Sequence, residues 1–394
     1  MDTAARARTI EARSSGRRPI VGLSAALAGL VLTAVAGCGG DDGDAVGDTS
    51  RGQTGTTATS AAPNTAEPSC EDGSLHDRAY VLCAAAGRTD QRLVVALHGR
   101  GSSADEMRTV TELDRHAADA GQAVVYPQAT DGGWGDDTFT SPARPVGDED
   151  VAFLDTLVGE LRADPRIDDG PIGVVGFSNG ASMALRYTSE HPDDVRAVVS
   201  VAGQLPRDPG VRPSGRVPLL EVYGTADPLR PYDVGIPEPP ARGPGDPTPT
   251  LPTRDTIAAF VAKGLGTSEH EVLADTDLDP TDGTSVRTER WTDRGGTLAV
   301  LRSIVGGGHT WPSSRGQFSL GENFGVTSGE MDASAEAVAF VLDPDGVRFH
   351  DETDRLTCSI AEGSRRVVVI GVQDLWDAGR SAPRRARLRL LHRG

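Results

Sequence analysis

The chain has 394 residues and is 37% hydrophobic, so it is long enough to bury at least one full core. Its formal net charge of -18 argues against a nucleic-acid partner and favours a soluble, self-repelling surface. The four cysteines include no C-x-x-C pair, so no metal site is predicted.

The first 38 residues have the features of a bacterial export signal. Five arginines precede an uncharged stretch, residues 19–40, whose centre is apolar. The motif Val35-Ala36-Gly37-Cys38 resembles a lipobox, in which the cysteine is lipidated and becomes the mature N-terminus. A transmembrane anchor is the alternative, and Arg17-Arg18 leaves a twin-arginine export route open. We expect a protein that is lipid-anchored on the outer face of the cell membrane, or secreted.

Residues 39–69 contain almost no large apolar side chain, which predicts a disordered tether. Cys70 and Cys83 flank a turn signal, and an exported protein can form a disulfide between them. Cys358 is left over, so other pairings remain open.

Apolar runs then alternate with amphipathic stretches. Strands are predicted at 77–82, 93–97, 123–127, 172–175, 197–201, 219–223, 285–292 and 298–303. Helices are predicted at 104–118, 148–161, 181–187 and 254–263. This alternation predicts an α/β fold, a mostly parallel sheet with helices on both faces, formed by residues 70–343 as one domain.

The strand at 93–97 leads into His98-Gly99-Arg100-Gly101. A strand that ends in H-G-x-G can supply half of an oxyanion hole, and the backbone N–H of Arg100 is the candidate donor. We interpret His98 as a residue that braces this loop. Trp134, on a glycine-rich loop at the same end of the sheet, is a candidate for substrate binding or for ordinary packing.

The strand at 172–175 leads into Gly176-Phe177-Ser178-Asn179-Gly180 and then into a helix. Strand, G-x-S-x-G and helix form the nucleophile elbow of an α/β-hydrolase, with Ser178 as the nucleophile. The helix start at Asn179 offers backbone N–H groups to an oxyanion.

An acid and a base are expected later in the chain, each after a strand. Asp227 follows the strand at 219–223 and is the candidate acid, with Asp233 as the second candidate and a turn aspartate as the structural alternative. His309 follows the last strand on the loop Gly306-Gly307-Gly308, which suits a general base that acts on Ser178.

Together, the G-F-S-N-G motif, Gly224-Thr225-Ala226-Asp227 and Gly307-Gly308-His309-Thr310-Trp311-Pro312 resemble the polyhydroxybutyrate depolymerase and feruloyl or acetylxylan esterase family. Its members include envelope lipoproteins, and the resemblance covers roughly residues 78–343. It implies an esterase with Ser178, Asp227 and His309 as triad, the Arg100 and Asn179 amides as oxyanion hole, Trp311 near the cleft and a closing helix at 331–342.

Depolymerases that act on insoluble polymer often carry a cysteine where Arg100 stands, which favours a small soluble ester over a polymeric one. We therefore expect a carboxylic ester hydrolase that acts as a monomer, needs no cofactor and has a membrane partner only through lipid at Cys38. The alternatives are a serine peptidase of the same fold and a non-catalytic envelope binding protein. Residues 344–394 form an extension with an Arg-rich end and no assigned role.

Overall fold

The computed structural model describes residues 67–136, 148–208, 210–237, 248–314, 316, 318 and 324–349. The chain divides into two units, Met1–Ser60 and Ala61–Gly394, and every described residue belongs to the second. The lipobox, most of the tether, Cys358 and the Arg-rich end therefore lie outside the described residues. Among those that are described, no helix is both long and apolar enough to cross a membrane.

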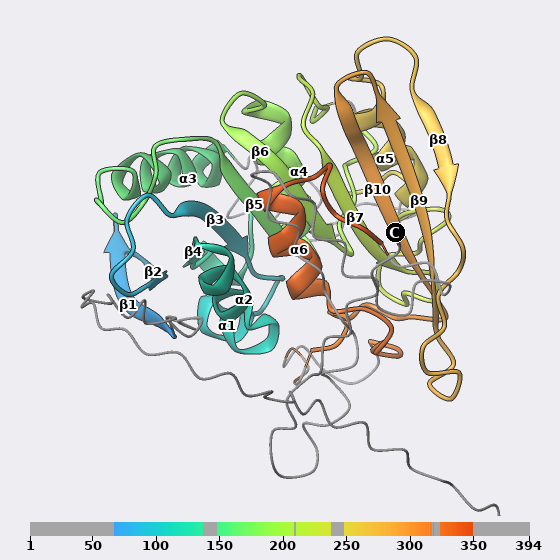
Figure 1. The fold of residues 1–394 in the computed structure, drawn as a ribbon, viewed down its shortest axis with the longest axis horizontal. Coiled ribbons are helices and arrows are strands. Elements are labelled where there is room, and N and C mark those ends of the chain that lie inside the picture. Colours follow the sequence, from blue (N-terminus) through green and yellow to red (C-terminus); the bar gives the residue numbers. More distant parts are fainter. Residues whose placement is uncertain are drawn as a thin grey trace, which may run out of the picture. The chain divides into compact units, whose positions relative to one another are not determined.

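One mixed sheet organises the described residues (Figure 1). Its strands lie in the order β1-β2-β4-β3-β5-β6-β7-β10-β9-β8. Their bounds are β1 Pro68–Leu75, β2 Arg78–Ala85, β3 Arg92–Leu97, β4 Gln122–Pro127, β5 Ile172–Phe177, β6 Val195–Val201, β7 Leu219–Gly224, β8 Glu269–Val272, β9 Ser285–Asp293 and β10 Gly296–Val305. The strands from β4 to β10 in this order pair in parallel, and the outer pairs are antiparallel.

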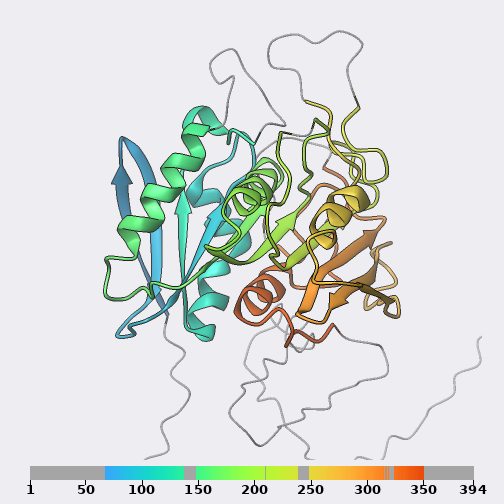
Figure 2. The same cartoon turned by 90° about the horizontal axis from the view of Figure 1, so that it is seen from above.

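Helices cover both faces of the sheet, as Figure 2 shows. Their bounds are α1 Ala104–Thr111, α2 Leu113–Ala120, α3 Asp148–Leu161, α4 Asn179–Glu190, α5 Thr253–Val261 and α6 Ala333–Leu342. Helices α3, α4 and α5 lie on one face, and α1, α2 and α6 lie on the other. Because both faces are covered, the central strands β3, β5 and β7 are buried almost throughout, which explains their continuous apolar runs.

The structure differs from the predicted elements at three places. The helix predicted at 104–118 is two helices, because Glu112 adopts a left-handed backbone with φ 48° between α1 and α2. Strand β1 begins at Pro68, inside the segment predicted to be a tether, and β8 was not predicted. Both are edge strands, and neither has the apolar content that makes a strand visible in a sequence.

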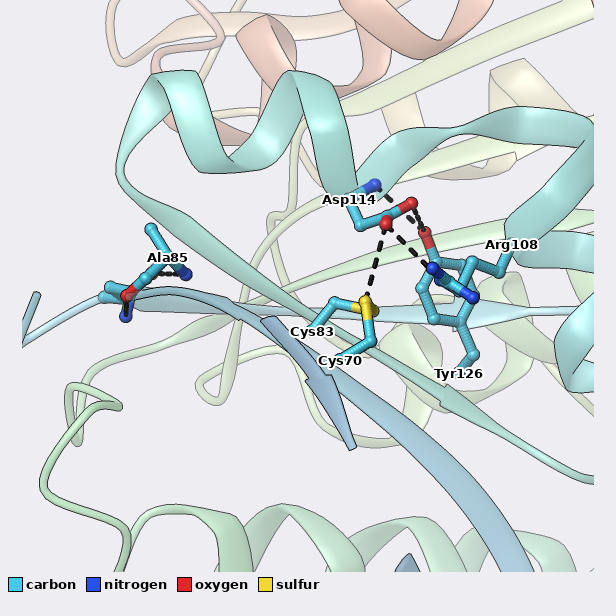
Figure 3. The surroundings of a disulfide bond; sticks show 7 residues. Cys70, Cys83, Ala85, Arg108, Asp114 and Tyr126 are labelled. Carbon is cyan, nitrogen blue, oxygen red and sulfur yellow. Dashed lines mark hydrogen bonds and ion pairs between the residues drawn. A yellow bond between two sulfur atoms is a disulfide. The ribbon is translucent and has the colours of Figure 1, made fainter. Parts of the chain in front are cut away.

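A disulfide joins β1 to β2 through Cys70 and Cys83, which lie directly opposite each other in the antiparallel pair (Figure 3). Asp114 of α2 lies beside the bond, and the hydroxyl of Tyr126 donates to its carboxylate at 3.1 Å. Cys70 Sγ is 3.6 Å from the other oxygen of Asp114. The covalent bond therefore fastens the first strand to β2, and the Asp114 side chain of α2 packs beside it.

Candidate active site

Ser178 lies between β5 and α4 in a backbone conformation that few residues adopt, with φ 56° and ψ −115°. A Cβ atom on Gly176 would lie 2.3 Å from the carbonyl oxygen of Gly180. A Cβ atom on Gly180 would lie 2.2 Å from the carbonyl oxygen of Leu97. Only glycine fits at these two positions, so the G-x-S-x-G spacing is a steric requirement of the tight turn that presents the serine.

Three side chains from the ends of parallel strands form a continuous hydrogen-bonded series. Ser178 Oγ is 2.8 Å from His309 Nε2, and His309 Nδ1 is 2.6 Å from Asp227 Oδ2. The residues follow β5, β10 and β7, whose carboxyl ends meet at one edge of the sheet. The structure thus brings together the three residues predicted to act as nucleophile, base and acid.

The carboxylate of Asp227 has a donor on each oxygen. The backbone N–H groups of Leu229 and Arg230 donate to Oδ1, both at 2.8 Å, and His309 Nδ1 donates to Oδ2. This arrangement places the imidazole proton on Nδ1 and leaves Nε2 free to accept from Ser178. Asp233, the second candidate, is exposed on the following loop.

The loop that carries His309 packs tightly against the loop that carries Asp227. A Cβ atom on Gly224 would lie 2.2 Å from the carbonyl oxygen of Gly308, so the two loops touch through bare backbone. The backbone N–H of His309 donates to the carbonyl oxygen of Phe324 at 2.6 Å. Gly224 therefore permits the close approach of the two loops, and Gly308, where a Cβ atom would lie 2.1 Å from the Phe324 carbonyl oxygen, permits the approach of the segment that follows.

The predicted oxyanion loop, residues 98–101, lies against the elbow. A Cβ atom on Gly99 would be 3.5 Å from Ser178 Cβ, so the residue before Arg100 packs directly against the nucleophile. His98 is fully buried, and burial lowers its pKa, which keeps the imidazole neutral. Its Nδ1 donates to the Gly99 carbonyl at 2.8 Å and its Nε2 accepts from Ala129 N–H at 3.0 Å. These bonds agree with the interpretation of His98 as a bracing residue.

Similarity to known proteins agrees with this geometry. The profile described as phospholipase/carboxylesterase matches residues 79–238. NocK of Nocardia uniformis subsp. tsuyamanensis, a protein described as an esterase, is 38% identical over 274 residues, which are 67% of this chain and 79% of NocK. The chain belongs to the phospholipase/carboxylesterase family.

Two further proteins resemble the chain at lower sequence identity. Feruloyl esterase C of Emericella nidulans is 27% identical over 174 residues, which are 41% of this chain and 59% of that enzyme. The solved acetyl xylan esterase from Aspergillus awamori is 14% identical with a TM-score of 0.42, over 61% of this chain and 94% of that one. Family membership makes the chain a carboxylic ester hydrolase with the α/β-hydrolase fold.

Trp134 is buried and does not line an open cleft. Its side chain is 2% exposed, and its Nε1 donates to the carbonyl oxygen of His98 at 2.9 Å. Its backbone N–H and C=O are both bonded by the side-chain amide of Asn179, at 2.7 and 3.0 Å. These contacts agree with the packing role that the sequence left open for Trp134, since its loop folds back onto the elbow and the indole braces the oxyanion loop; a role in substrate binding stays a prediction.

Trp311 is also buried, at 1% exposure, and its Nε1 donates to Ser334 Oγ at 2.9 Å. It forms one wall of a small cavity of about 10 Å³ beside His309, together with Phe318 and Phe324. Trp311 therefore lies near His309, as predicted, and as a buried side chain it forms part of the wall of this small cavity. A larger cavity of about 350 Å³ lies between α5 and β9 and is lined by no triad residue.

Glu221, in the middle of β7, is a buried acid that the sequence analysis did not single out. It is 0% exposed, and burial raises its pKa well above the ordinary value for glutamate. The Ser200 hydroxyl, the Gly203 amide and the charge of Arg230 offset only part of this shift. Folding therefore favours the protonated carboxyl of Glu221, relative to the unfolded chain, in which its pKa has the ordinary value.

We expect Glu221→Gln to stabilise the protein at neutral and alkaline pH. Below the unfolded pKa of about 4.3, Glu221 is protonated in both states and its ionisation costs the folded state nothing. As the pH rises from there toward the folded pKa, the unfolded chain loses the proton more easily, so the free energy of unfolding falls. Glutamine does not titrate, so the variant avoids this loss. Measured between about pH 4 and pH 8, the Tm difference should be near zero at low pH and grow as the pH rises. The same Tm difference at every pH would contradict this account.

Proposed function

We propose that the protein is a serine esterase in which Ser178, His309 and Asp227 form the catalytic triad. The observation that carries the proposal is the series of two hydrogen bonds from Ser178 Oγ through His309 to Asp227. All three residues are at least nine-tenths buried, so few waters compete for these bonds. The strained backbone of Ser178 costs stability, and such strain is found mainly at functional sites. Its presence beside a paired imidazole therefore favours a catalyst over a non-catalytic binding protein.

The geometry supports a two-step reaction through an acyl-enzyme. Ser178 Oγ attacks the ester carbonyl carbon while His309 Nε2 takes the hydroxyl proton, and the charge of Asp227 stabilises the imidazolium. The backbone N–H groups of Arg100 and Asn179 are the proposed donors to the oxyanion. When the C–O bond breaks, His309 returns the proton to the leaving alcohol. Water then attacks the acyl group with His309 as base, and the carboxylic acid leaves.

We propose a small soluble ester as the substrate. Ser178 is only 9% exposed, and the cavity beside its base is narrow and walled by Trp311, Phe318 and Phe324. The relatives named as feruloyl esterases make a hydroxycinnamate ester a reasonable test compound. A flat polymer surface would have to reach a nucleophile that lies below the surface.

The test combines a covalent probe with a substrate series. A fluorophosphonate should label the wild-type protein with one equivalent, and nitrophenyl esters of graded acyl length should be compared with methyl ferulate and a peptide anilide. Cleavage of the esters with no cleavage of the anilide supports the proposal. Absence of labelling in folded protein would refute it, and faster cleavage of the anilide would favour a peptidase.

We further propose that the protein is exported and anchored through lipid on Cys38, with residues 39–67, which precede β1, as spacer. The support is the basic, apolar and small-residue order of the first 38 residues.

Cys38→Ser should leave the protein unprocessed or release it from the membrane, because the lipid on this cysteine would be the anchor. Fractionation of cells and mass spectrometry of the mature N-terminus measure this. A conservative change nearby, Thr49→Ser, is the control and should leave lipid attachment intact. Wild-type protein with no bound lipid would contradict the anchor.

A further inference from the structure

Arg230 is a buried arginine three residues after Asp227, and it is 2% exposed. Arginine is almost never buried to this extent unless its charge and its N–H groups have partners. The partners of Arg230 lie on separate segments of the chain, and each segment carries one part of the proposed catalytic machinery.

The backbone of Arg230 holds the acid. Its N–H donates to Asp227 Oδ1 at 2.8 Å, and its carbonyl oxygen accepts from the Tyr223 hydroxyl at 3.0 Å. Tyr223 lies in β7 and is almost fully buried. The Arg230 backbone thus connects the carboxylate that bonds His309 to the strand that precedes it.

The side chain of Arg230 reaches the nucleophile helix. Its Nη1 donates to Ser182 Oγ at 2.6 Å, and Ser182 lies one turn after Ser178 in α4. Ser182 Oγ in turn donates to the carbonyl oxygen of Gln204 at 2.9 Å, after β6. A displacement of Arg230 would therefore remove one of the bonds that hold the first turn of α4, where the proposed oxyanion donor Asn179 also lies.

The same guanidinium pairs with a third segment. Its Nη2 is 3.7 Å from Asp136 Oδ2, and Asp136 is fully buried. Asp136 follows Trp134, which braces the oxyanion loop through its bond to His98. The hydrogen bond to Ser182 and the ion pair with Asp136 use different nitrogens of one planar guanidinium, so the group sets the relative position of the two segments in a way that a lysine ammonium, a single point charge, would not.

We propose that Arg230 is a positioning residue that aligns the acid, the nucleophile and the oxyanion loop. The proposal rests on the proposed serine esterase function. Arg230 acts through Asp227, Ser182 and Asp136 and does not touch the reacting atoms. A shift of about 1 Å in such a site can cost about 100-fold in rate, so the alignment has a measurable effect.

The experiment compares Arg230→Met and Arg230→Lys with the wild type on p-nitrophenyl acetate. Each kcat is divided by the concentration of sites that a fluorophosphonate labels, so unfolded protein does not count. We expect Arg230→Met to lower kcat about 10- to 100-fold with KM changed by less than about twofold. Arg230→Lys keeps the charge but cannot reach both partners, so kcat should fall by about 3- to 10-fold.

Arg302→Met is the matched control. Arg302 is 4% exposed and pairs with Glu336 at 2.9 Å and with Thr288, away from the three segments. This variant should lose thermal stability while kcat per labelled site stays within about twofold of the wild type.

Wild-type kcat per labelled site in both Arg230 variants would overturn the proposal. If Arg230→Met does not fold, Arg230→Lys decides: a loss of about threefold or more supports the role, and wild-type kcat refutes it. Failure of the proposed function itself has a different signature, since the wild-type protein would then not be labelled by the probe.

Discussion

Ser178→Ala should remove nearly all esterase activity while the protein stays folded. Loss of the nucleophile in a serine hydrolase lowers turnover by about 10⁴- to 10⁶-fold, because the covalent path is lost while the oxyanion donors remain. Alanine is smaller than serine and adds no atom that could clash at this turn. The measurements are kcat on p-nitrophenyl acetate, labelling by a fluorophosphonate and the Tm.

Ser189→Ala is a suitable control. Ser189 lies in the same helix, is 2% exposed and donates to the Leu185 carbonyl, far along α4 from the elbow. Loss of the Ser189 hydroxyl should leave kcat and fluorophosphonate labelling unchanged. If Ser178→Ala protein of verified purity keeps more than a few per cent of the activity, Ser178 is not the nucleophile.

Asp227→Asn should lower kcat/KM by about 10⁴-fold, because an amide lacks the charge that stabilises the imidazolium and can hold the wrong tautomer of His309. Asparagine has the same shape as aspartate, so its Oδ1 can still accept the backbone N–H groups of Leu229 and Arg230. The loss should therefore appear in the rate while labelling becomes slow and the fold persists. Single-turnover kinetics on the same ester measure the acylation step directly.

Asp233→Asn tests the other candidate acid under the same conditions. Asp233 is exposed on the next loop, so this variant should keep wild-type kinetics. A large loss in Asp233→Asn with normal rates in Asp227→Asn would reverse the assignment of the acid.

The central fold and the triad candidates could be predicted because each rests on a strict local constraint. The elbow needs glycine at 176 and 180 for steric reasons, and the acid and base must follow parallel strands that end at the same edge of the sheet. Buried parallel strands are also continuous apolar runs, so β3, β5 and β7 are visible in the sequence.

What the sequence did not reveal depends on contacts between distant segments. Trp134 looked available to a substrate because nothing local shows that its loop packs on Asn179 and His98. Arg230 and Glu221 are charged types that are usually exposed, so their burial appears only in three dimensions. The break at Glu112 had no glycine or proline to mark it.

The Cys70–Cys83 bond has a mechanical consequence for a protein that is held to a surface by its N-terminus. Tension along the proposed spacer enters β1 at Pro68, and only the pairs Pro68↔Ala85 and Ser69↔Ala84 lie ahead of the disulfide. Beyond them the load passes through the covalent bond into Cys83, whose neighbour across the sheet is Val124 of β4. While the disulfide is intact, tension from the N-terminus cannot pull the part of β1 that follows Cys70 away from β2, and the load reaches the rest of the sheet through the pairs between β2 and β4.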